Sequence, residues 1–374
     1  MSKKYTRLTA PVGGKLNFTK SYHPDQDKAR AIEEAFSGSE ISTERRVIRE
    51  IACKDFSVLI PTHNGAENLK KTIPALISAI KTYGRGKVEV IIMDNASTDH
   101  TGAVVKRMWP SLRVIRTDKL KGMPEILNQG VKLCRYPVVM LLQDTVKVSA
   151  GFALPLLEAI SDDDIFAAVP SIRDKTRKGI ITSICLMKFI NGAISLQMIS
   201  DGNFPEPVYI PGLVNTACMF HKNIFNSLGG FDELFTPCYM EDLDLGYRAW
   251  KRGHRVVYCR GSSVTQLEAT PVADALWDKD QELLKIKNYL IFMAKNITDK
   301  AYYVLHWINM AKKLFSIHIG LDKDRTYLEG WKRMKKTGGE IGKKRKLESS
   351  DAYFTDTELI RLFSSHPDNR IGIG

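Results

Sequence analysis

Three stretches of the sequence place polar or acidic residues directly after a run of apolar residues. Residues 56–60 (FSVLI) are followed by PTHNG, residues 88–93 (VEVIIM) by DNASTD, and residues 138–142 (VVMLL) by QDT. Asp and Asn side chains can bind a base or ribose edge. A carboxylate such as Asp144 can hold Mg²⁺ or Mn²⁺ against a diphosphate, because these ions prefer oxygen ligands. Turns also attract such residues for structural reasons, but three stretches together favour a ligand site.

A second group of acids stands at the start of a helix predicted at residues 240–252. Glu241 and Asp242 open this segment and Asp244 follows. A carboxylate beside a charged diphosphate can act as a general base toward a hydroxyl group, because its pKa can be raised toward that task. Acids at a helix N-terminus also complement the helix dipole, so both interpretations stay open. Asp244 is about 200° further round the helix than Asp242 and should point elsewhere.

Alternating patterns of apolar residues predict the elements that position these side chains. Short β-branched runs predict strands, and apolar residues at helical spacing predict the helices between them. We predict strands at 56–60, 88–93, 112–116 and 138–142, and helices at 68–81, 103–108 and 123–134. This alternation indicates βαβ units and a mostly parallel sheet covered on both faces. In such sheets ligands bind beyond the carboxyl ends of the strands, where the three polar stretches lie.

The remaining sequence divides into the rest of this domain and two flanking regions. We predict an N-terminal extension at 1–54, a catalytic domain at 55–272 and a helical, basic region at 273–374. The extension is polar, and Ser42-Thr43-Glu44 would open a short helix in it. The other predicted elements are strands at 166–170 and 255–259, a long helical stretch at 281–317, a basic amphipathic segment at 321–347, and a helix at 354–363 opened by Thr355 or Asp356.

Composition and short motifs exclude several classes of protein. The 374 residues are 44% hydrophobic and 26% charged, as in ordinary globular proteins, and the formal charge of +13 favours anionic partners. The chain has no CxxC pair, no GxGxxG after its first strand and no GxxxxGK[ST], which disfavours zinc ribbons, dinucleotide-binding dehydrogenases and P-loop NTPases. No apolar run approaches the roughly 20 residues that span a bilayer. We therefore expect a cytoplasmic protein, with the inner face of the membrane as an alternative location.

Five sequence blocks together resemble one enzyme family. FSVLIPTHNG, VIIMDNASTD, VVMLLQDTV, GGFDELF and YMEDLDLGYRAWKRG, in this order and spacing, resemble family 2 glycosyltransferases with the GT-A fold. They are most similar to the rhamnosyltransferase-like branch that builds bacterial surface polysaccharides, and LKIKNYLIFMAKN resembles the helix that follows the catalytic domain there. The resemblance covers about residues 55–270. It implies an α/β fold with a Rossmann-like, mixed and mostly parallel sheet, followed here by a C-terminal helical extension.

The resemblance also implies roles for individual residues. It assigns Asp242 as the general base, Glu241 as its neighbour that orients acceptor or metal, and Asp144 as the metal ligand. The family's Asp-rich metal motif is reduced here to Gln143-Asp144-Thr145, and Gln266 stands where the family often has a His. Gly212 and Asp232 match the acceptor side. The implied nucleotide-binding residues are Pro61, Thr62, Asn64, Glu67, Asp94, Asn95, Ser97, Lys121 and Asn128.

The resemblance predicts an inverting glycosyltransferase of the hexosyltransferase type. It would use a nucleotide-diphosphate sugar, Mg²⁺ or Mn²⁺, and a glycan or lipid-linked acceptor. The alternative is a non-catalytic GT-A-like module that binds nucleotide or glycan, suggested by the reduced metal motif. A nucleotidyltransferase is disfavoured because PTHNGAENLKK lacks a Gly-rich, Arg-containing loop.

The helical region raises separate questions about partners. Residues 332–346 are either a solvated helical face or a peripheral membrane contact, and a homodimer contact through 281–317 is a further alternative. No nucleic-acid partner is expected, because the basic tail lacks the interleaved aromatic residues of single-strand platforms.

Overall fold

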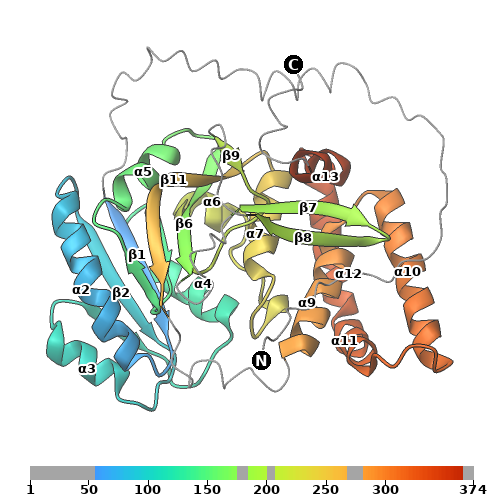
Figure 1. Cartoon of the computed structure of the whole chain (residues 1–374), viewed down its shortest axis with the longest axis horizontal. Helices are drawn as coiled ribbons and strands as arrows, with labels where there is room; N and C mark the ends of the chain where they lie inside the picture. Colours follow the sequence, from blue (N-terminus) through green and yellow to red (C-terminus); the bar gives the residue numbers. More distant parts are fainter. Residues whose placement is uncertain (1–54, 175–183, 200–206, 268–280, 365–374) are drawn as a thin grey trace, which may run out of the picture.

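The structure is a computed structural model that describes residues 55–174, 184–199, 207–267 and 281–364. The predicted extension at 1–54, including the helix opened by Ser42, lies outside these residues. The predicted boundary at residue 272 also lies outside them, so the division into domains stays a prediction. Figure 1 shows a central sheet with helices on both faces and a group of C-terminal helices beside it.

One half of the sheet is parallel, as the alternating pattern predicts. The strand order there is β3-β2-β1-β4, with every neighbouring pair parallel. β1 is buried along its whole length, which explains its continuous apolar sequence. The elements of this half are β1 (Phe56–Thr62), α2 (Ala66–Tyr83), β2 (Val88–Asp94), α3 (Thr101–Met108), β3 (Arg113–Arg116), α4 (Met123–Leu133) and β4 (Val138–Leu142).

Pro61 does not end the first strand. β1 continues to Thr62, and Pro61 lies opposite Met93 of β2. A proline is tolerated there because β4 pairs with β1 only over Phe56–Leu59, so no ladder partner requires the missing N–H on the other side.

The other half of the sheet is mixed. β10 lies antiparallel between β4 and β6, β11 runs parallel to β6, and β5 and β9 pair antiparallel with β11. The elements are β5 (Val146–Val148), α5 (Ala153–Ala159), β6 (Ile165–Asp174), β9 (Val208–Tyr209), β10 (Ala217–His221), α6 (Lys222–Ser227), η3 (Glu233–Phe235), α7 (Glu241–Lys251) and β11 (Arg255–Gln266). A separate hairpin of β7 (Ile184–Ile190) and β8 (Ala193–Ile199), which we did not predict, reaches toward the C-terminal helices (Figure 1).

The C-terminal region is helical, as predicted, but its long first stretch is two helices. The chain turns at Thr298–Asp299, where both main-chain N–H groups donate to Asp356 Oδ2. Thr355 caps the last helix, because its hydroxyl accepts from Glu358 N at 3.2 Å. The helices are α9 (Gln281–Asn296), α10 (Lys300–His318), α11 (Arg325–Lys336), α12 (Gly338–Ser350) and α13 (Asp356–Ser364).

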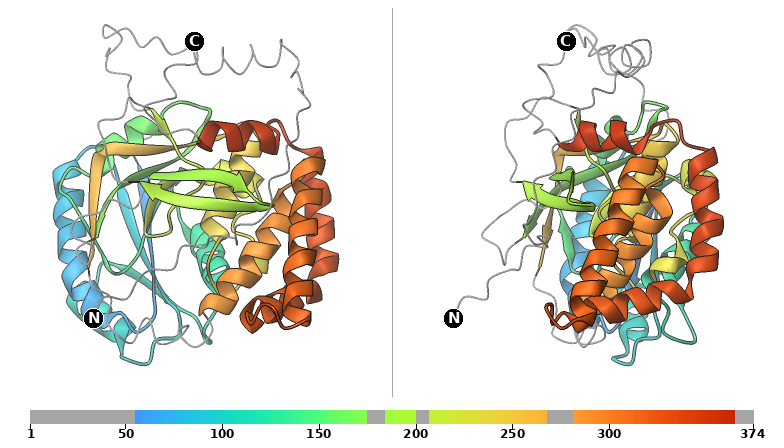
Figure 2. Two further views of the ribbon diagram at one scale, coloured as in Figure 1. Left: turned by 45° about the vertical axis from the view of Figure 1, so that its right-hand side comes forward. Right: turned by 90° about the vertical axis from the view of Figure 1, so that its right-hand side faces the viewer.

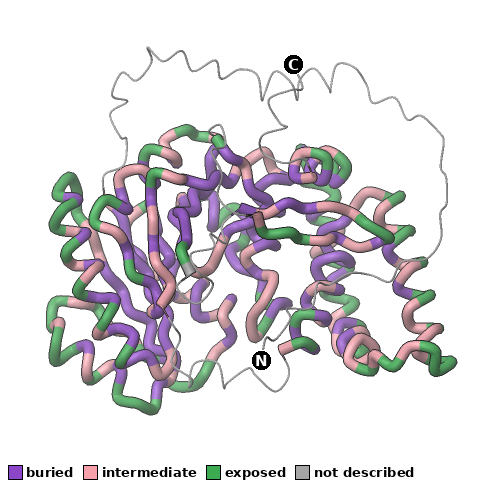
Figure 3. The backbone as a smooth tube through the Cα atoms, viewed as in Figure 1, coloured by how far each residue is buried: buried purple, intermediate pink, exposed green. Residues whose placement is uncertain are grey.

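A single buried core extends from the sheet into the C-terminal helices (Figure 3). Trp250 of α7 packs edge-on against Phe363 of α13, with ring centroids 5.2 Å apart. Tyr247 and Trp250 are fully buried, so these aromatic residues belong to the core. The two views of Figure 2 show the C-terminal helices grouped on one side of the molecule, and of these α9 contacts α7. None of the described helices is long and apolar enough to cross a membrane.

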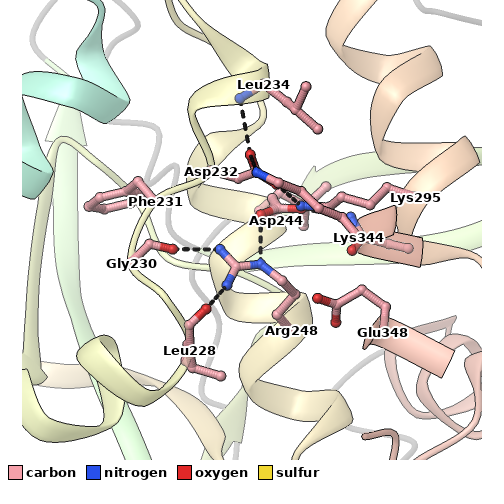
Figure 4. Close-up of polar contacts among 12 residues, drawn as sticks. Leu228, Gly230, Phe231, Asp232, Leu234, Asp244, Arg248, Lys295, Lys344 and Glu348 are labelled. Carbon is pink, nitrogen blue, oxygen red and sulfur yellow. Dashed lines mark hydrogen bonds and ion pairs between the residues drawn. The ribbon is translucent and has the colours of Figure 1, made fainter. Parts of the chain in front are cut away.

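Buried ion pairs tie this core together beneath α7. Lys295 of α9 lies between Asp232 Oδ2 at 2.5 Å and Asp244 Oδ1 at 2.6 Å. Arg248 pairs with the other oxygen of Asp244 at 2.8 Å, and Lys344 pairs with Asp232 Oδ1 (Figure 4). Asp244 therefore points away from the helix N-terminus, as its position on the helix predicts. Although burial opposes ionisation, the Lys295 ammonium holds the pKa of Asp232 well below its usual range.

A second buried cluster joins α7 to α13. Lys251 Nζ lies 2.9 Å from Asp356 Oδ1, and the Tyr247 hydroxyl donates to the same oxygen at 2.7 Å. Asp356 Oδ2 accepts from the turn at Thr298–Asp299. One carboxylate thus connects α7, the α9–α10 turn and α13.

Replacement of Lys295 by Met should strongly destabilise the protein. The substitution keeps most of the apolar stem but leaves two buried carboxylates without their shared cation, and breaking a buried pair typically costs about 3–5 kcal/mol. Urea denaturation measures the free energy of unfolding, with Lys312→Met on exposed α10 as the matched control. Adding Asp244→Asn to Lys295→Met should restore part of the loss. Equal stability of Lys295→Met and Lys312→Met would contradict the role of the network.

Candidate active site

The first and third polar stretches meet at the carboxyl edge of the sheet. The Thr62 hydroxyl, at the end of β1, donates to Asp144 Oδ2, just after β4, at 2.6 Å. Gly65 allows this approach: a Cβ there would lie 2.1 Å from both Asp144 Oδ2 and Thr62 Oγ1. Any side chain at position 65 would displace the Asp144 carboxylate, so the close approach requires glycine.

The second polar stretch is cross-linked to the first. Buried Asp94 accepts from Ser97 N at 2.9 Å and from Arg116 Nη1 at 3.0 Å. Asn64 N donates to Ser97 Oγ at 2.9 Å, and Asn64 Oδ1 accepts from Thr98 N at 2.7 Å. The two strand exits therefore form one hydrogen-bonded layer above the sheet.

Several predicted nucleotide-binding residues have structural contacts that the sequence did not reveal. Asn95 exchanges two hydrogen bonds of 2.9 Å with the main chain of Lys121, and Asn128 exchanges two with the main chain of Phe231 at 2.8 and 2.9 Å. Lys121 Nζ lies 2.6 Å from Glu125 Oε1. Direct nucleotide contacts of these residues stay predictions. Of the others, Glu67 is exposed and pairs with Lys70, while Pro61 is buried in β1.

Asp144 has an unusual environment for a carboxylate. Burial raises the pKa of Asp144 to about 6, the hydrogen bond from Thr62 opposes this rise, and the charge of Asp99 adds to it. Gln266, predicted to replace a family His, lies on the strand next to the segment that follows Asp144. It pairs with Val146 of β5, and Leu267 N donates to Thr145 O at 2.9 Å.

The metal prediction meets a sparse set of ligands. Among the described residues, no group of three or more His, Cys, Asp or Glu side chains could hold a metal ion. Asp144 supplies one carboxylate beside the Thr62 hydroxyl. These residues fit only a metal whose other ligands come from a bound diphosphate.

Glu241 and Asp242 open α7, and a neighbouring segment packs closely on this end of the helix. A Cβ on Gly246 would lie 2.4 Å from Gly212 Cα, so two glycines allow the main chains to touch. Leu213 N donates to Asp242 O at 3.2 Å. Gly212, predicted on the acceptor side, therefore lies directly beneath the acidic helix start.

Asn215 follows this segment and contacts both acids. The sequence analysis did not predict these contacts. Its Nδ2 donates to Glu241 Oε1 at 2.8 Å, and its main-chain N lies 3.5 Å from Asp242 Oδ2. Glu241 is only 3% exposed, and no described residue bonds its Oε2. The blocks that carry the resemblance leave a gap between VVMLLQDTV, which ends at residue 146, and GGFDELF, which begins at residue 229, so none of them marked residue 215.

Burial shifts the pKa of both acids in the same direction. It raises the pKa of Glu241 to about 8, and the charge of Asp242 adds to the rise. Burial also raises the pKa of Asp242, while hydrogen bonds from the main chain of Leu243 and Asn215 oppose the rise. A raised pKa makes a carboxylate a better proton acceptor, as a general base requires.

The two parts of the site are connected through one strand pair. Gln143 N donates to Thr216 O at 3.0 Å, and Ala217 pairs with Leu142 in the sheet. Asp144 follows β4, and Asn215 precedes the neighbouring antiparallel strand β10. Both residues therefore lie at the same edge of the sheet. Asp232, predicted on the acceptor side, lies instead in the buried ion network, because both of its carboxylate oxygens pair with lysines.

Comparisons with known proteins agree with this architecture. Residues 57–229 match the family model for glycosyl transferase family 2. The probable glycosyltransferase YdaM of Bacillus subtilis (strain 168) is 25% identical over 210 residues, which cover 54% of this chain and 47% of that protein. A poly-beta-1,6-N-acetyl-D-glucosamine synthase of Staphylococcus aureus (strain COL) is 25% identical over 200 residues, covering 51% and 45%. This chain spans about half the length of these curated relatives.

A solved structure shares the fold at low sequence identity. The crystal structure of GalNAc-T7 with UDP, GalNAc and Mn²⁺ aligns with a TM-score of 0.52 and 15% identity, over 75% of this chain and 54% of that chain. Together with the family match, it identifies residues 57–229 as a glycosyl transferase family 2 domain, built on the GT-A fold.

Proposed function

We propose that this protein is an inverting glycosyltransferase that moves a hexose from a nucleotide-diphosphate sugar to a hydroxyl of a glycan or lipid-linked acceptor. The observation that carries the proposal is the position of two acidic groups at one edge of the sheet. Asp144 follows β4, and Asn215, which contacts Glu241 and Asp242, precedes the neighbouring strand β10. The family match ends at residue 229, so the role of Asp242 rests on its position and environment. The rhamnosyltransferase-like branch stays a prediction.

In the proposed reaction, Asp242 removes the proton of the acceptor hydroxyl as its oxygen attacks the anomeric carbon. A new C–O bond forms, and the bond from that carbon to the diphosphate breaks on the opposite side, so the nucleoside diphosphate leaves with the electron pair. The acceptor proton ends on Asp242. A hydroxyl group needs this help because its own pKa is far above neutral.

In this proposal, Glu241 limits the negative charge of the site. As a neutral carboxyl near pH 7, it adds no second negative charge to the region that receives a diphosphate. Asn215 fixes the orientation of Glu241 through the 2.8 Å hydrogen bond. Gly212 and Gly246 hold the segment against the helix so that Asn215 can reach both acids.

Asp144 belongs to the donor side of the proposed site. It is the described carboxylate that would hold a divalent metal, which when bound would neutralise charge on the leaving diphosphate. The protein's own contribution there is Thr62, which orients the Asp144 carboxylate, and the cross-linked layer of the first two strand exits. A non-catalytic binding module is not favoured, because such a module would not require two adjacent acids whose pKa values are both raised by burial.

Asp242→Asn should remove most turnover while the fold and donor binding remain. Asparagine keeps the size of the side chain but cannot take the proton, and loss of a general base typically lowers kcat by about 10²–10⁴. The matched control is Glu241→Gln, which imitates the protonated neighbour and should retain most activity at neutral pH. Release of nucleoside diphosphate measures both variants. Asp242→Asn activity above roughly a tenth of wild type would contradict the assignment.

Asp144→Asn should abolish most of the metal enhancement of donor binding. In the wild-type protein this enhancement should also fall as the pH drops through about 6, because Asp144 then becomes protonated. The raised pKa means that the ionised side chain destabilises the folded state above this pH. The variant should therefore melt at a higher temperature than wild type at pH 8 and not at pH 4. Calorimetric titration of nucleoside diphosphate, with and without Mn²⁺, and thermal melts test the prediction; equal metal enhancement in both proteins contradicts it.

Asn215→Ala should change the pH profile of the reaction. The Asn215 amide donates to Glu241 and favours its ionised form. The variant should therefore raise the pKa of Glu241 above about 8 and move the alkaline limb of the kcat/KM profile to higher pH. Asn226→Ala on the surface of α6 is the control. A profile that falls uniformly in height, without a shift of either limb, would show that Asn215 only supports the fold.

A further inference from the structure

The basic segment at 321–347, for which membrane contact was one of two alternatives, packs several of its apolar and basic side chains inside the protein. Met334 of α11 and Ile341 of α12 are buried, and Gly330 packs on Ile286 of α9. Lys344 pairs with Asp232, and Arg345 lies over the ring of Tyr303 at 3.7 Å. The amphipathic pattern of residues 321–347 is therefore used for packing inside the protein.

A different helix exposes an apolar stripe. Val304 is 54% and Phe315 63% exposed on α10, whereas His306 and Met310 on the opposite side are buried. At about 100° per residue, the exposed residues fall within one face of the helix. This α10 face comprises Val304, Leu305, Ile308, Phe315 and Ile319, the last directly after the helix end. The right-hand view of Figure 2 shows α10 on the outer side of the molecule.

The exposed charges of α10 itself are all positive. The sequence of the helix contains no Asp or Glu; the exposed Lys300 lies beside the stripe, and the exposed Lys312 lies within it. Its third lysine, Lys313, pairs with Asp322 at 2.7 Å. Across residues 281–364 the sequence holds 17 Lys and Arg against 10 Asp and Glu. A second copy of the chain would bring these cations against each other, whereas anionic lipid headgroups would neutralise them.

The β7–β8 hairpin joins this face to the rest of the molecule. His306 Nδ1 donates to Gly192 O, at the hairpin turn, over 2.8 Å. Phe189 packs against Tyr302 with ring centroids 4.3 Å apart, and Ile190 at the tip is 48% exposed. The hairpin tip is thus fixed on α10 and extends its apolar surface.

We propose that the α10 face, with Ile190 of the hairpin tip, docks on the surface of an anionic lipid bilayer. Apolar side chains on one helical face, with lysines beside and among them, match the chemistry of the interface between headgroups and acyl chains. Contiguous exposed apolar surface of this kind marks an interaction site in a protein that is otherwise well packed.

The hairpin carries further exposed apolar side chains behind its tip. Met198, which pairs with Cys185 across the hairpin, is 48% exposed, and Leu196 is exposed on the same face. These side chains extend the apolar surface of the hairpin beyond Ile190.

Sedimentation of the full chain with lipid vesicles tests the docking. The protein should sediment with vesicles of phosphatidylcholine containing phosphatidylglycerol at low salt, less at high salt, and weakly with phosphatidylcholine alone. Lys300→Gln with Lys312→Gln should weaken binding by up to about 30-fold, since each lysine near the surface contributes about 1 kcal/mol. Ile308→Ser with Phe315→Ser should reduce binding to both vesicle types.

Two control variants and a second measurement decide between the possible results. Met108→Ser removes an equally exposed apolar residue from α3, and Lys343→Gln with Lys346→Gln removes exposed lysines from α12; neither should change binding. No binding to anionic vesicles at low salt, or equal binding of the α10 variants, overturns the proposal. Light scattering that shows a dimer dissociated by Ile308→Ser with Phe315→Ser assigns the face to a second copy instead. Vesicle binding needs no turnover, so the result of this experiment does not depend on whether the proposed transfer activity is correct.

Discussion

Lys295 is the contact on which the geometry of the acidic helix depends. Its ammonium group lies between Asp232, which caps η3, and Asp244, in the first turn of α7. A cation buried this deeply is stable only with such partners, because desolvation of an unpaired charge costs several kcal/mol. The pairing holds α9 against α7 and so fixes where Glu241 and Asp242 begin. The helix after the catalytic domain is in this sense part of the site.

The loop before α7 is held by the same helix. Asn288 of α9 donates to the carbonyl oxygens of Phe235, Cys238 and Tyr239 at 2.7–2.9 Å. Tyr239 and Met240 both have left-handed backbone conformations, with φ of 80° and 74°. Such conformations are unfavourable for residues with side chains and persist only where surrounding contacts enforce them. Asn288 and Lys295 together place a strained turn directly before the two acids.

The sequence predicted the parallel half of the fold well, because its strands and helices have clear periodicity. The strand at 138–142 is reproduced residue for residue, and the other predicted strands of that half differ by one or two residues at their ends. The hairpin at 184–199 was missed although the sequence marks its turn. Asn191 and Gly192, with φ of 50° and 77°, form the two-residue connection that Asn-Gly favours between antiparallel strands. The break at Thr298–Asp299 was missed because the carboxylate that holds it belongs to Asp356, far along the chain.

Contacts between residues far apart in the sequence also limited the prediction of the site. Polar stretches after strands could be recognised from their own residue types, which is why Thr62, Asp144 and the Glu241–Asp242 pair were predicted as site residues. The partners of Asn95, Asn128 and Asp232 lie 26, 103 and 63 residues away. A single sequence does not show that these polar groups are already satisfied by the protein. Asn215 was missed for the same reason, since its importance comes from where Gly212 and Gly246 allow it to lie.

Asp356 has a consequence for how the protein can be shortened or degraded. The carboxylate neutralises Lys251 inside α7 and caps the turn between α9 and α10 from a helix near the end of the described chain. A protease that removes α13 would therefore leave a buried ammonium group in the catalytic domain without its counter-ion. Loss of α13 would thus destabilise α7, the helix that carries Glu241 and Asp242, although α13 itself lies more than 100 residues further along the chain.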